Sequence, residues 1–589
     1  MPESLDPSRE LTFVDHPEAL NPGIPWARLG SSLLGSANTE PLDLSGQIRA
    51  NRDRVRAAFV AWLGGINAAR ASLTWWAHTT SAKNLLSSPL GNQVLELIAL
   101  QNLLGSANTT QIGVVGATHG QIEVWRNLAN QLKAKVQVTD STRLPETLRF
   151  PFLRILWQFF KTLAIWSVYM RPARAAYGAD IIVLTYVDRN FRGGGDAFFG
   201  QLAGHLAKTT AKSSVLHLAY IQGPYRRILG ALGASREFRY AALFAELHLS
   251  DIGWALAYTL AALKRAYQWP RLPMLDGIDF EPVMRRSLLW DLVKGGYFQN
   301  LLVYRAAVRV GERLAPEHLI YPYENKSLEK MLLLGLYSKA SACRTIGYQH
   351  TSVTPRHTTL LFARGEAART PLPNRIVTAG DITLGWLKAY GYYPDGILRS
   401  GPALRQIKRS PHSRRSRANP DKVRVLFALS SSLAELHKAA LWLLDAAKEK
   451  PSWEFAIRTH PEFPLEYLPE NIRCTVEARA MDFSSTSLDE NFQWCDVVAY
   501  ASSTVALEAL MAGRPVVCID LGELLDPDPM IEAAPLRWTA QTPADLIDAT
   551  IDAISVSRLD FERMQRDAHA FANKYFRSIE PERISAFLD

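Results

Sequence analysis

The spacing of apolar residues changes along the chain, and the first quarter is dominated by a helical period. Residues 1–45 are rich in Pro, Gly and Ser without a sustained period, so we expect them to lack regular structure. Residues 48–104 carry apolar side chains at helical spacing, with breaks expected at Gly64-Gly65 and near 87–89. This segment therefore predicts two or three helices.

Strand-like patterns begin after these helices. Short apolar runs at 111–115 and 135–138 flank helical sequence and predict a small α/β unit. From residue 180 onward, continuous apolar runs alternate with polar turns and helical segments, as is typical of strands buried on both faces of a parallel sheet. Residues 240–267 predict one long helical stretch. The predicted strands lie at 180–187, 213–221, 318–323, 345–348, 375–380, 423–429, 453–458 and 496–500, and another opens after Pro515.

The length of the chain and one basic segment indicate how these strands are divided. A chain of 589 residues exceeds what one hydrophobic core usually holds, so we expect two or three domains. Residues 406–422, QIKRSPHSRRSRANPDK, contain two prolines and few apolar side chains, which predicts a basic linker. The strand, turn and helix pattern is present on both sides of this linker. The fold class is therefore α/β, with two large bodies.

Charge and cysteine content narrow the function only slightly. A formal net charge of +9 favours anionic partners such as nucleotides, acidic lipids or nucleic acid, and charge alone does not choose among them. The four cysteines show no metal-ligand spacing, so we expect neither a zinc site nor a disulfide. The first twenty residues lack the basic and apolar regions of a secretory signal. We therefore expect a cytoplasmic protein.

Residues 149–174 form an aromatic-rich stretch that approaches the length of a membrane span. Arg154, Gln158 and Lys161 fall at i, i+4 and i+7, so a helix would gather them on one face, and a spanning helix is not expected. Two alternatives stay open. The helix either lies in the headgroup layer of an anionic membrane, or covers a core as an ordinary amphipathic helix. Both require a wide apolar face.

Polar side chains follow the strands of the second body, where parallel sheets bind ligands. Pro461 ends the strand that delivers Arg458-Thr459-His460-Pro461 and fixes the backbone, so that Arg458 and His460 can meet a phosphate. Serine-rich turns open two helices, whose N–H groups can face an anion or simply be capped. The candidate nucleotide-binding residues are Ser431, Arg458, His460, Pro461, Ser502, Ser503, Thr504 and Glu508.

The first body offers carboxylates and a histidine at its strand ends. Glu324 and Asn325 occupy a strand-to-helix turn, and Glu329 lies about one turn into the helix. A partly desolvated carboxylate there can act as general base on an acceptor hydroxyl, while helix capping is the alternative role. His350 can relay a proton or orient a phosphate, or can be an ordinary buried histidine. The candidate catalytic residues are Glu324, Glu329 and His350.

A glycine-rich loop at 188–196 follows the first strand of this body. It does not match the GxGxxG fingerprint, so we do not expect a dinucleotide there. Its position at a strand end makes it a candidate contact for an acceptor. The candidate acceptor-binding residues are Asp188, Arg192, Asp196, Asn325 and Gln349.

The motifs of the second body resemble a known family. His460-Pro461 together with Ser502-Ser503-Thr504 and the following EALMAGRPVV is similar to the donor-binding half of GT-B glycosyltransferases. The similarity is marked for bacterial enzymes that use CMP-activated sugars, such as sialyl-, polysialyl- and Kdo transferases, and for CDP-polyol phosphotransferases of teichoic acid synthesis. In those enzymes the His and the Ser/Thr turn contact the phosphate of the cytidine nucleotide. The resemblance implies the same role for His460 and residues 502–504.

Most of the chain also resembles bacterial surface carbohydrate biosynthesis proteins of capsule and lipopolysaccharide assembly. The segments that carry this likeness are Trp75-Trp76, TYVDRNF, YPYENKSLE, GYQHTSVTPRH and PNRIVTAG. The sequence departs from the polysialyltransferases because it lacks an acidic D/E-D/E-G base motif in its N-terminal half. Glu324 is our substitute for that base.

The resemblance implies a GT-B-like fold, with two Rossmann-like domains facing a cleft and a mostly helical N-terminal extension. It implies a glycosyltransferase that moves Kdo or another nonulosonic acid from a CMP-sugar to a surface glycan or lipid-linked acceptor. A CDP-polyol phosphotransferase and a nucleotide-sugar epimerase are the alternatives. The predicted divisions are an extension at 1–174, an acceptor domain at 175–405, a linker at 406–422, a donor domain at 423–560 and a returning C-terminal helix at 561–589.

The expected partners are a nucleotide-sugar, a glycan or lipid-linked acceptor and, where residues 149–174 lie on it, an anionic membrane at the inner face of the cell. No nucleic acid and no cofactor are expected. A GT-B donor site needs no metal when helix dipoles and basic side chains neutralise the leaving phosphate. The one DxD sequence, Asp526-Pro527-Asp528, lies in a proline-rich loop where a turn is expected.

Overall fold

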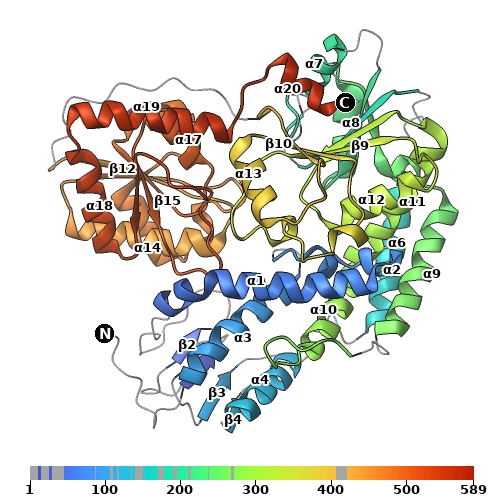
Figure 1. Ribbon diagram of the computed structural model, residues 1–589, viewed down its shortest axis with the longest axis horizontal. Helices are drawn as coiled ribbons and strands as arrows, with labels where there is room; N and C mark the ends of the chain where they lie inside the picture. The colour runs from blue at the N-terminus through green and yellow to red at the C-terminus, as the bar shows by residue number, and fades with distance from the viewer. Residues whose placement is uncertain are drawn as a thin grey trace.

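The computed structural model describes most of the chain and contains three parallel sheets covered by helices (Figure 1). The described residues are 11–14, 26–28, 45–85, 88–106, 111–115, 119–133, 135–139, 150–169, 178–189, 191, 196–209, 214–236, 238–266, 271–405 and 421–588. The predicted linker therefore lies almost entirely outside the described residues, as does Arg192.

The N-terminal extension contains a small four-stranded sheet in the order β2-β1-β3-β4. Its strands are β1 (Leu11–Val14), β2 (Trp26–Arg28), β3 (Gln111–Val115) and β4 (Lys135–Thr139). The expectation that residues 1–45 lack regular structure is wrong for β1 and β2, because their backbones pair in parallel with each other and with β3. Strands this short give too few residues for a periodic pattern.

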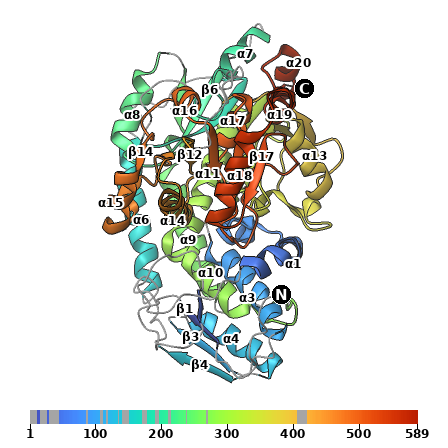
Figure 2. The same ribbon diagram turned by 90° about the vertical axis from the view of Figure 1, so that its left-hand side faces the viewer.

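Some helices of the extension lie beside this sheet, and the others lie against the first large body (Figures 1 and 2). They are α1 (Ser45–Arg70), α2 (Leu73–Trp76), the 3₁₀ turn η2 (Thr79–Ala82), α3 (Pro89–Ser106), α4 (His119–Leu132) and α6 (Pro151–Tyr169). The break expected at Gly64-Gly65 is wrong, since α1 runs through it. A Cβ on Gly64 would come within 2.5 Å of Ala363 Cβ and Glu366 Oε2, so this glycine permits close packing.

The first large body is built on a seven-stranded parallel sheet in the order β11-β10-β9-β8-β5-β6-β7. Its strands are β5 (Ile181–Val187), β6 (Val215–Ile221), β7 (Tyr240–Ala242), β8 (His318–Pro322), β9 (Arg344–Gln349), β10 (Arg375–Thr378) and β11 (Leu398–Ser400). Its helices are α7 (Leu202–Thr209), α8 (Tyr225–Ala234), η3 (Leu243–Glu246), α9 (Leu249–Ala266), α10 (Glu281–Lys294), α11 (Gly296–Leu314), α12 (Ser327–Tyr337), η4 (Thr358–Leu360), η5 (Ala367–Arg369) and α13 (Asp381–Tyr390). The prediction of one long helical stretch at 240–267 is wrong at its start, where β7 adds an edge strand to β6.

The second large body is a six-stranded parallel sheet in the order β14-β13-β12-β15-β16-β17. Its strands are β12 (Arg424–Ala428), β13 (Glu454–Arg458), β14 (Ala480–Asp482), β15 (Val497–Tyr500), β16 (Val516–Ile519) and β17 (Arg537–Ala540). Its helices are α14 (Leu433–Glu449), η6 (Leu465–Tyr467), α15 (Glu470–Arg479), α16 (Leu488–Trp494), α17 (Val505–Met511), α18 (Pro543–Ser555) and α19 (Arg558–Tyr575).

Both large sheets have the doubly wound order of a Rossmann-like domain, which confirms the predicted fold class. In the first body the strand order reverses between β5 and β8, which pair directly. In the second body it reverses between β12 and β15. Ligands of such sheets bind outside the carboxyl ends of the strands at these reversal points, which we call switch points. The fold is thus GT-B-like, with two Rossmann-like domains and a largely helical N-terminal extension.

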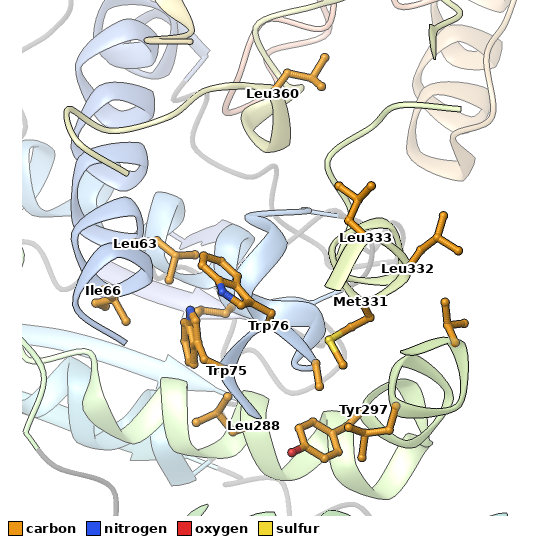
Figure 3. Close-up of a cluster of buried hydrophobic side chains, with 14 of the residues drawn as sticks. Leu63, Ile66, Trp75, Trp76, Leu288, Tyr297, Met331, Leu332, Leu333 and Leu360 are labelled. Atoms are coloured by element: carbon orange, nitrogen blue, oxygen red, sulfur yellow. The ribbon is translucent and has the colours of Figure 1, made fainter. Parts of the chain in front are cut away.

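The extension and the first body share one hydrophobic core across the predicted boundary at residue 174. Side chains of α1, such as Leu63, and the buried Trp75 and Trp76 of α2 belong to the same cluster as Ile182 of β5 and Leu332 of α12. Figure 3 shows the two tryptophans beside residues of α10, α11 and α12. The extension therefore supports α12, the helix that carries Glu329.

The C-terminal chain crosses back from the second body to the first. Helix α19 packs on the second body, and Phe561 and Ala572 are buried in its core. Beyond it, Arg577 Nε donates to Asp381 of α13 at 2.7 Å, and α20 (Pro581–Ile584) and η7 (Ser585–Phe587) follow. Ile584 and Phe587 are buried against the first sheet, where Figure 1 places the C-terminus near α7.

Candidate functional site

The switch point of the first body is occupied by the turn between β8 and α12. Asn325 has a left-handed backbone, with φ of 56°, and its side-chain amide donates to the Thr359 carbonyl at 2.6 Å. The Glu324 N–H lies 3.2 and 3.0 Å from the two carboxylate oxygens of Glu329. The structure therefore brings Glu324, Asn325 and Glu329 together, as the sequence pattern predicted.

Glu324 is the carboxylate of this turn that reaches solvent, since 31% of its side chain is exposed. Its carboxylate forms an ion pair with Lys326, and one oxygen lies 3.9 Å from His350 Nε2. Burial acts to raise the pKa of Glu324, but the ammonium of Lys326 beside it holds that pKa below its usual value. Glu324 is consequently ionised at neutral pH and can accept a proton.

Glu329 differs from Glu324 because it is almost fully buried, with 1% of its surface exposed. Burial and, to a lesser extent, the neighbouring Glu324 carboxylate raise the pKa of Glu329 to about 8. Its oxygens face the backbone N–H of the turn. This arrangement fits a residue that shapes the turn around Glu324.

Gln349 is the last residue of β9, the neighbour of β8 in the sheet, and His350 follows it; both side chains are buried. Burial lowers the pKa of His350 to about 4, so its imidazole is neutral at physiological pH. The Gln349 amide donates to the Thr351 carbonyl at 2.6 Å, and its buried Oε1 has no hydrogen-bond partner among the residues the structure describes. That oxygen can accept a hydrogen bond from a ligand.

The acceptor-loop residues are separated by the structure. Asp188 is exposed directly after β5, at the same switch point as Glu324. Asp196 is buried, accepts the N–H groups of Phe198 and Phe199 at 2.8 and 3.0 Å, and lies 3.2 Å from His217 Nδ1. Its carboxylate is therefore turned into the domain. Arg192 lies outside the described residues.

The switch point of the second body is organised by a buried carboxylate, Glu435, near the start of α14. Its Oε1 accepts the Ser430 N–H at 3.1 Å, and its Oε2 accepts the Ser430 hydroxyl at 2.5 Å and also the Ser502 hydroxyl. The two serine hydroxyl oxygens lie 2.5 Å apart. The two hydroxyls therefore share the Glu435 carboxylate, and either one can also donate to the other.

His460 lies beside this switch point, after β13, and is partly exposed. Burial lowers the pKa of His460, and its Nδ1 accepts the Glu462 N–H at 3.2 Å. The neutral ring therefore carries its proton on Nε2, which can donate to a phosphate oxygen. Pro461 follows at the exposed start of the next turn.

The side chains around His460 have other contacts as well. Arg458 Nη1 donates to the carbonyls of Phe483 and Thr486 at 2.9 and 2.6 Å and to Asn491 Oδ1 at 2.9 Å. These bonds tie the end of β13 to α16. The exposed Ser431 hydroxyl donates to Glu462. Contact of either residue with a nucleotide stays a prediction.

The Ser502-Ser503-Thr504 turn connects β15 to the short helix α17. The Ser503 hydroxyl accepts the N–H of Val505, the first residue of α17, at 3.3 Å. Ser502 and Thr504 are partly exposed, and Glu508 lies one turn along α17. The turn therefore presents polar groups at the same switch point as Glu435.

The carboxyl edges of the two large sheets lie against each other. Arg356, in the loop after β9, forms an ion pair of 3.1 Å with Glu523, in the loop after β16. Helix α1 adds a second connection, because Arg52 binds both carboxylate oxygens of Asp520 at 2.8 and 2.7 Å. Figure 1 shows α1 running beneath both bodies. The candidate catalytic and nucleotide-binding residues thus belong to facing edges.

Two groups of buried charged residues were missed from the sequence. The sequence does contain a signal for Glu435, because Ser432 and Glu435 match the S-x-x-E pattern of a helix start. That pattern predicts that the Glu435 carboxylate accepts the N–H of Ser432, whereas in the structure it accepts the N–H of Ser430. The second group lies under α12, where Lys83 pairs with Glu366, both fully buried. Lys330 donates to the Ser81 carbonyl at 3.2 Å, and burial lowers the pKa of Lys330 to about 7. No local pattern relates these residues.

The DxD sequence forms a structural turn. Asp526 accepts the Asp528 N–H at 3.0 Å, and the buried Asp528 pairs with Arg537 and accepts the Tyr500 hydroxyl at 3.0 Å. Within the described part of the chain, no three His, Cys, Asp or Glu side chains gather where they could hold a metal ion.

Comparisons with known proteins find likeness in fold alone. No protein-family model matches the chain. No curated protein sequence matches it. Similar solved structures include UDP-GlcNAc 2-epimerase of Neisseria meningitidis bound to UDP-GlcNAc, with a TM-score of 0.38, 10% identity, and coverage of 67% of this chain and 97% of that chain.

Two further structures come from cell-surface glycan synthesis. A lipopolysaccharide outer core galactosyltransferase has a TM-score of 0.37 and 12% identity, covering 69% of this chain and 98% of that chain. The wall teichoic acid polymerase TagF has a TM-score of 0.33 and 10% identity, covering 74% of this chain and 95% of that chain. Likeness this distant does not carry the reactions of those proteins over to this chain. The GT-B-like fold itself rests on the order of the strands in the two facing sheets.

Proposed function

We propose that this protein is a glycosyltransferase that moves a sugar from a CMP-activated donor to a hydroxyl of a bacterial surface glycan or lipid-linked acceptor. The observation that supports the proposal is that the switch points of the two large bodies lie on facing edges of the two sheets. One holds a solvent-accessible, ionised Glu324, and the other holds polar turns and a neutral His460. Kdo or another nonulosonic acid is the proposed sugar, on the resemblance of His460-Pro461 and the Ser/Thr turn to CMP-sugar transferases.

In the proposed reaction, the acceptor oxygen attacks the anomeric carbon of the donor sugar. The bond between that carbon and the phosphate oxygen breaks, and CMP leaves with the bonding electrons. Glu324 takes the acceptor proton, since its pKa below the usual value keeps it ionised at neutral pH. Glu329 shapes the turn that carries Glu324, and His350 lies beside the same carboxylate.

The departing phosphate is stabilised in the second body. His460 Nε2–H donates to a phosphate oxygen, and the N–H groups of the Ser502-Ser503-Thr504 turn add further donors. Ser430 and Ser502, whose hydroxyls are directed at Glu435, accept hydrogen bonds from the ribose or the base. No metal is needed in this scheme. The proposed place of work is the cytoplasm, at the inner face of the membrane.

Substitution of Glu324 tests the chemistry. Glu324→Gln should keep CMP binding within about twofold and lower transfer from CMP-Kdo to a glycan acceptor by at least about 100-fold, because general-base catalysis contributes roughly 10²–10⁴-fold. Glu317→Gln is the matched control. Glu317 is exposed and directly precedes the first residue of β8, at the end of the strand away from Glu324. Full transfer by Glu324→Gln would contradict the assignment. Consumption of donor without any acceptor would point to an epimerase.

A further inference from the structure

Helix α6 exposes a large apolar surface. Five large apolar side chains, four in α6 and one directly before it, are more than half exposed. So many exposed apolar residues of this size are unusual in one helix. They are Phe150 at 63%, Phe152 at 52%, Leu153 at 60%, Trp157 at 60% and Phe160 at 59%.

The opposite side of α6 is already used for packing. Ile155 is buried, and Phe159, Leu163 and Trp166 pack against the main core. The Trp166 indole also donates to the Leu247 carbonyl at 3.0 Å. The two alternatives drawn from the sequence are therefore not exclusive: one face of the helix covers a core, and a second apolar face remains outside.

The outer face has an ordered arrangement. Leu153, Trp157 and Phe160 stand at i, i+4 and i+7, so they form one stripe along the helix. Arg154 and Lys161 are exposed, and each lies one position beyond a member of that stripe, so the two cations border it. Between Pro151 and Tyr169 there is no acidic residue. In Figure 2, α6 runs along the left-hand side of the molecule below α8.

We propose that this face of α6 docks the protein on an anionic lipid surface, with Leu153, Trp157 and Phe160 in the acyl boundary and Arg154 and Lys161 at the headgroups. Aromatic and aliphatic side chains bordered by cations fit the interface of an anionic bilayer. A second copy of the chain fits less well, because a two-fold contact would bring the cations of both copies into one interface. Among the described residues, no helix is long and apolar enough to cross a membrane.

The position of α6 relates this surface to the candidate catalytic edge. Ile165, in the second half of α6, packs on a cluster that contains Val187 and Ile221, the last residues of β5 and β6. Glu324 follows β8, the neighbour of β5. A protein docked through α6 would therefore hold this edge near the bilayer, where a lipid-linked acceptor is presented. This last step rests on the proposed function, whereas the docking itself does not.

The docking is tested by sedimentation of the full chain with vesicles. Wild type should bind vesicles of phosphatidylglycerol and phosphatidylcholine, bind pure phosphatidylcholine more weakly, and be released by salt. The variant Leu153→Ser/Trp157→Ser/Phe160→Ser should lose at least about 100-fold in partitioning. Arg154→Gln/Lys161→Gln should lose on the order of 20-fold, on anionic vesicles only.

A matched control removes equally exposed apolar side chains from other places. Met274→Ser/Tyr392→Ser/Leu559→Ser alters residues that are 67%, 62% and 80% exposed, and it should bind vesicles as wild type does. Wild type that stays in the supernatant, or equal binding by the stripe variant, would overturn the proposal. A wild-type dimer that dissociates in the stripe variant, without vesicle binding, would overturn it in favour of a second copy. CMP binding measured on the same samples keeps this outcome separate from the proposed activity.

Discussion

The carboxylate of Glu435 joins the two loops at the switch point of the second body, so its removal should loosen both. In Glu435→Ala, the Ser430 N–H and the hydroxyls of Ser430 and Ser502 lose their common acceptor. Burial raises the pKa of Glu435; a hydrogen bond contributes about 0.5–1.5 kcal/mol, or about 1.5–3 kcal/mol where one partner is charged. The two hydroxyls can turn to water because both serines are partly exposed. We therefore expect a loss of about 2–5 kcal/mol rather than the full sum of the three bonds.

This loss should be visible in both stability and binding. A destabilisation of that size corresponds to a fall of roughly 5–15 °C in the Tm of the transition that unfolds the second body. CMP binding should weaken by about tenfold to 100-fold, since tenfold in Kd corresponds to about 1.4 kcal/mol. Thermal unfolding and calorimetric titration with CMP measure the two effects.

Glu449 supplies the control for this experiment. It is an exposed glutamate at the other end of α14, so Glu449→Ala makes the same substitution without touching the serine loops. A Glu435→Ala protein with wild-type Tm and CMP affinity, or an equal loss in Glu449→Ala, would contradict the role assigned to Glu435.

Further predictions concern the buried charges and the donor site. Lys83→Met should lower the free energy of unfolding in urea by about 3–5 kcal/mol, because it leaves Glu366 buried without its cation. Lys83→Met/Glu366→Gln should recover part of this loss. An unchanged urea midpoint in Lys83→Met would be inconsistent with a buried ion pair. The pKa of His350 is about 4 in the folded protein and about 6.5 in the unfolded chain, so protonation favours the unfolded state. The free energy of unfolding should therefore fall by up to about 3 kcal/mol as the pH falls from 6.5 to 4. A His350→Gln protein whose Tm depends on pH as steeply as that of wild type would argue against this. Transfer should continue in EDTA, and a loss that Mg²⁺ restores would show that the donor site needs a metal.

Much of the architecture could be predicted because the strands are continuous apolar runs followed by polar turns. The apolar runs predict β5, β8 and β15 within one or two residues, and the turn at Glu324 follows from the end of β8. The short strands β7, β11, β14 and β17 were missed, since three or four edge residues carry no period that distinguishes them.

The buried polar partners could not be predicted because they depend on tertiary packing. Nothing near Lys83 in the sequence indicates Glu366, 283 residues away, or the ammonium of Lys330 beneath the same core. The two faces of α6 illustrate the same limit. An aromatic-rich helix predicts a wide apolar surface, but only the fold shows that Phe159 is packed inside and Phe160 is exposed.

Calorimetric titration of the full chain with CMP tests whether a cytidine nucleotide binds at His460 opposite Glu324. Wild type should bind CMP more tightly than UMP, AMP or GMP. His460→Ala should weaken CMP binding by at least about tenfold, because it removes a hydrogen bond to the phosphate that is worth about 1.5–3 kcal/mol. A wild-type protein that binds no nucleotide, or a His460→Ala protein with wild-type affinity for CMP, would show that the nucleotide site is not at His460.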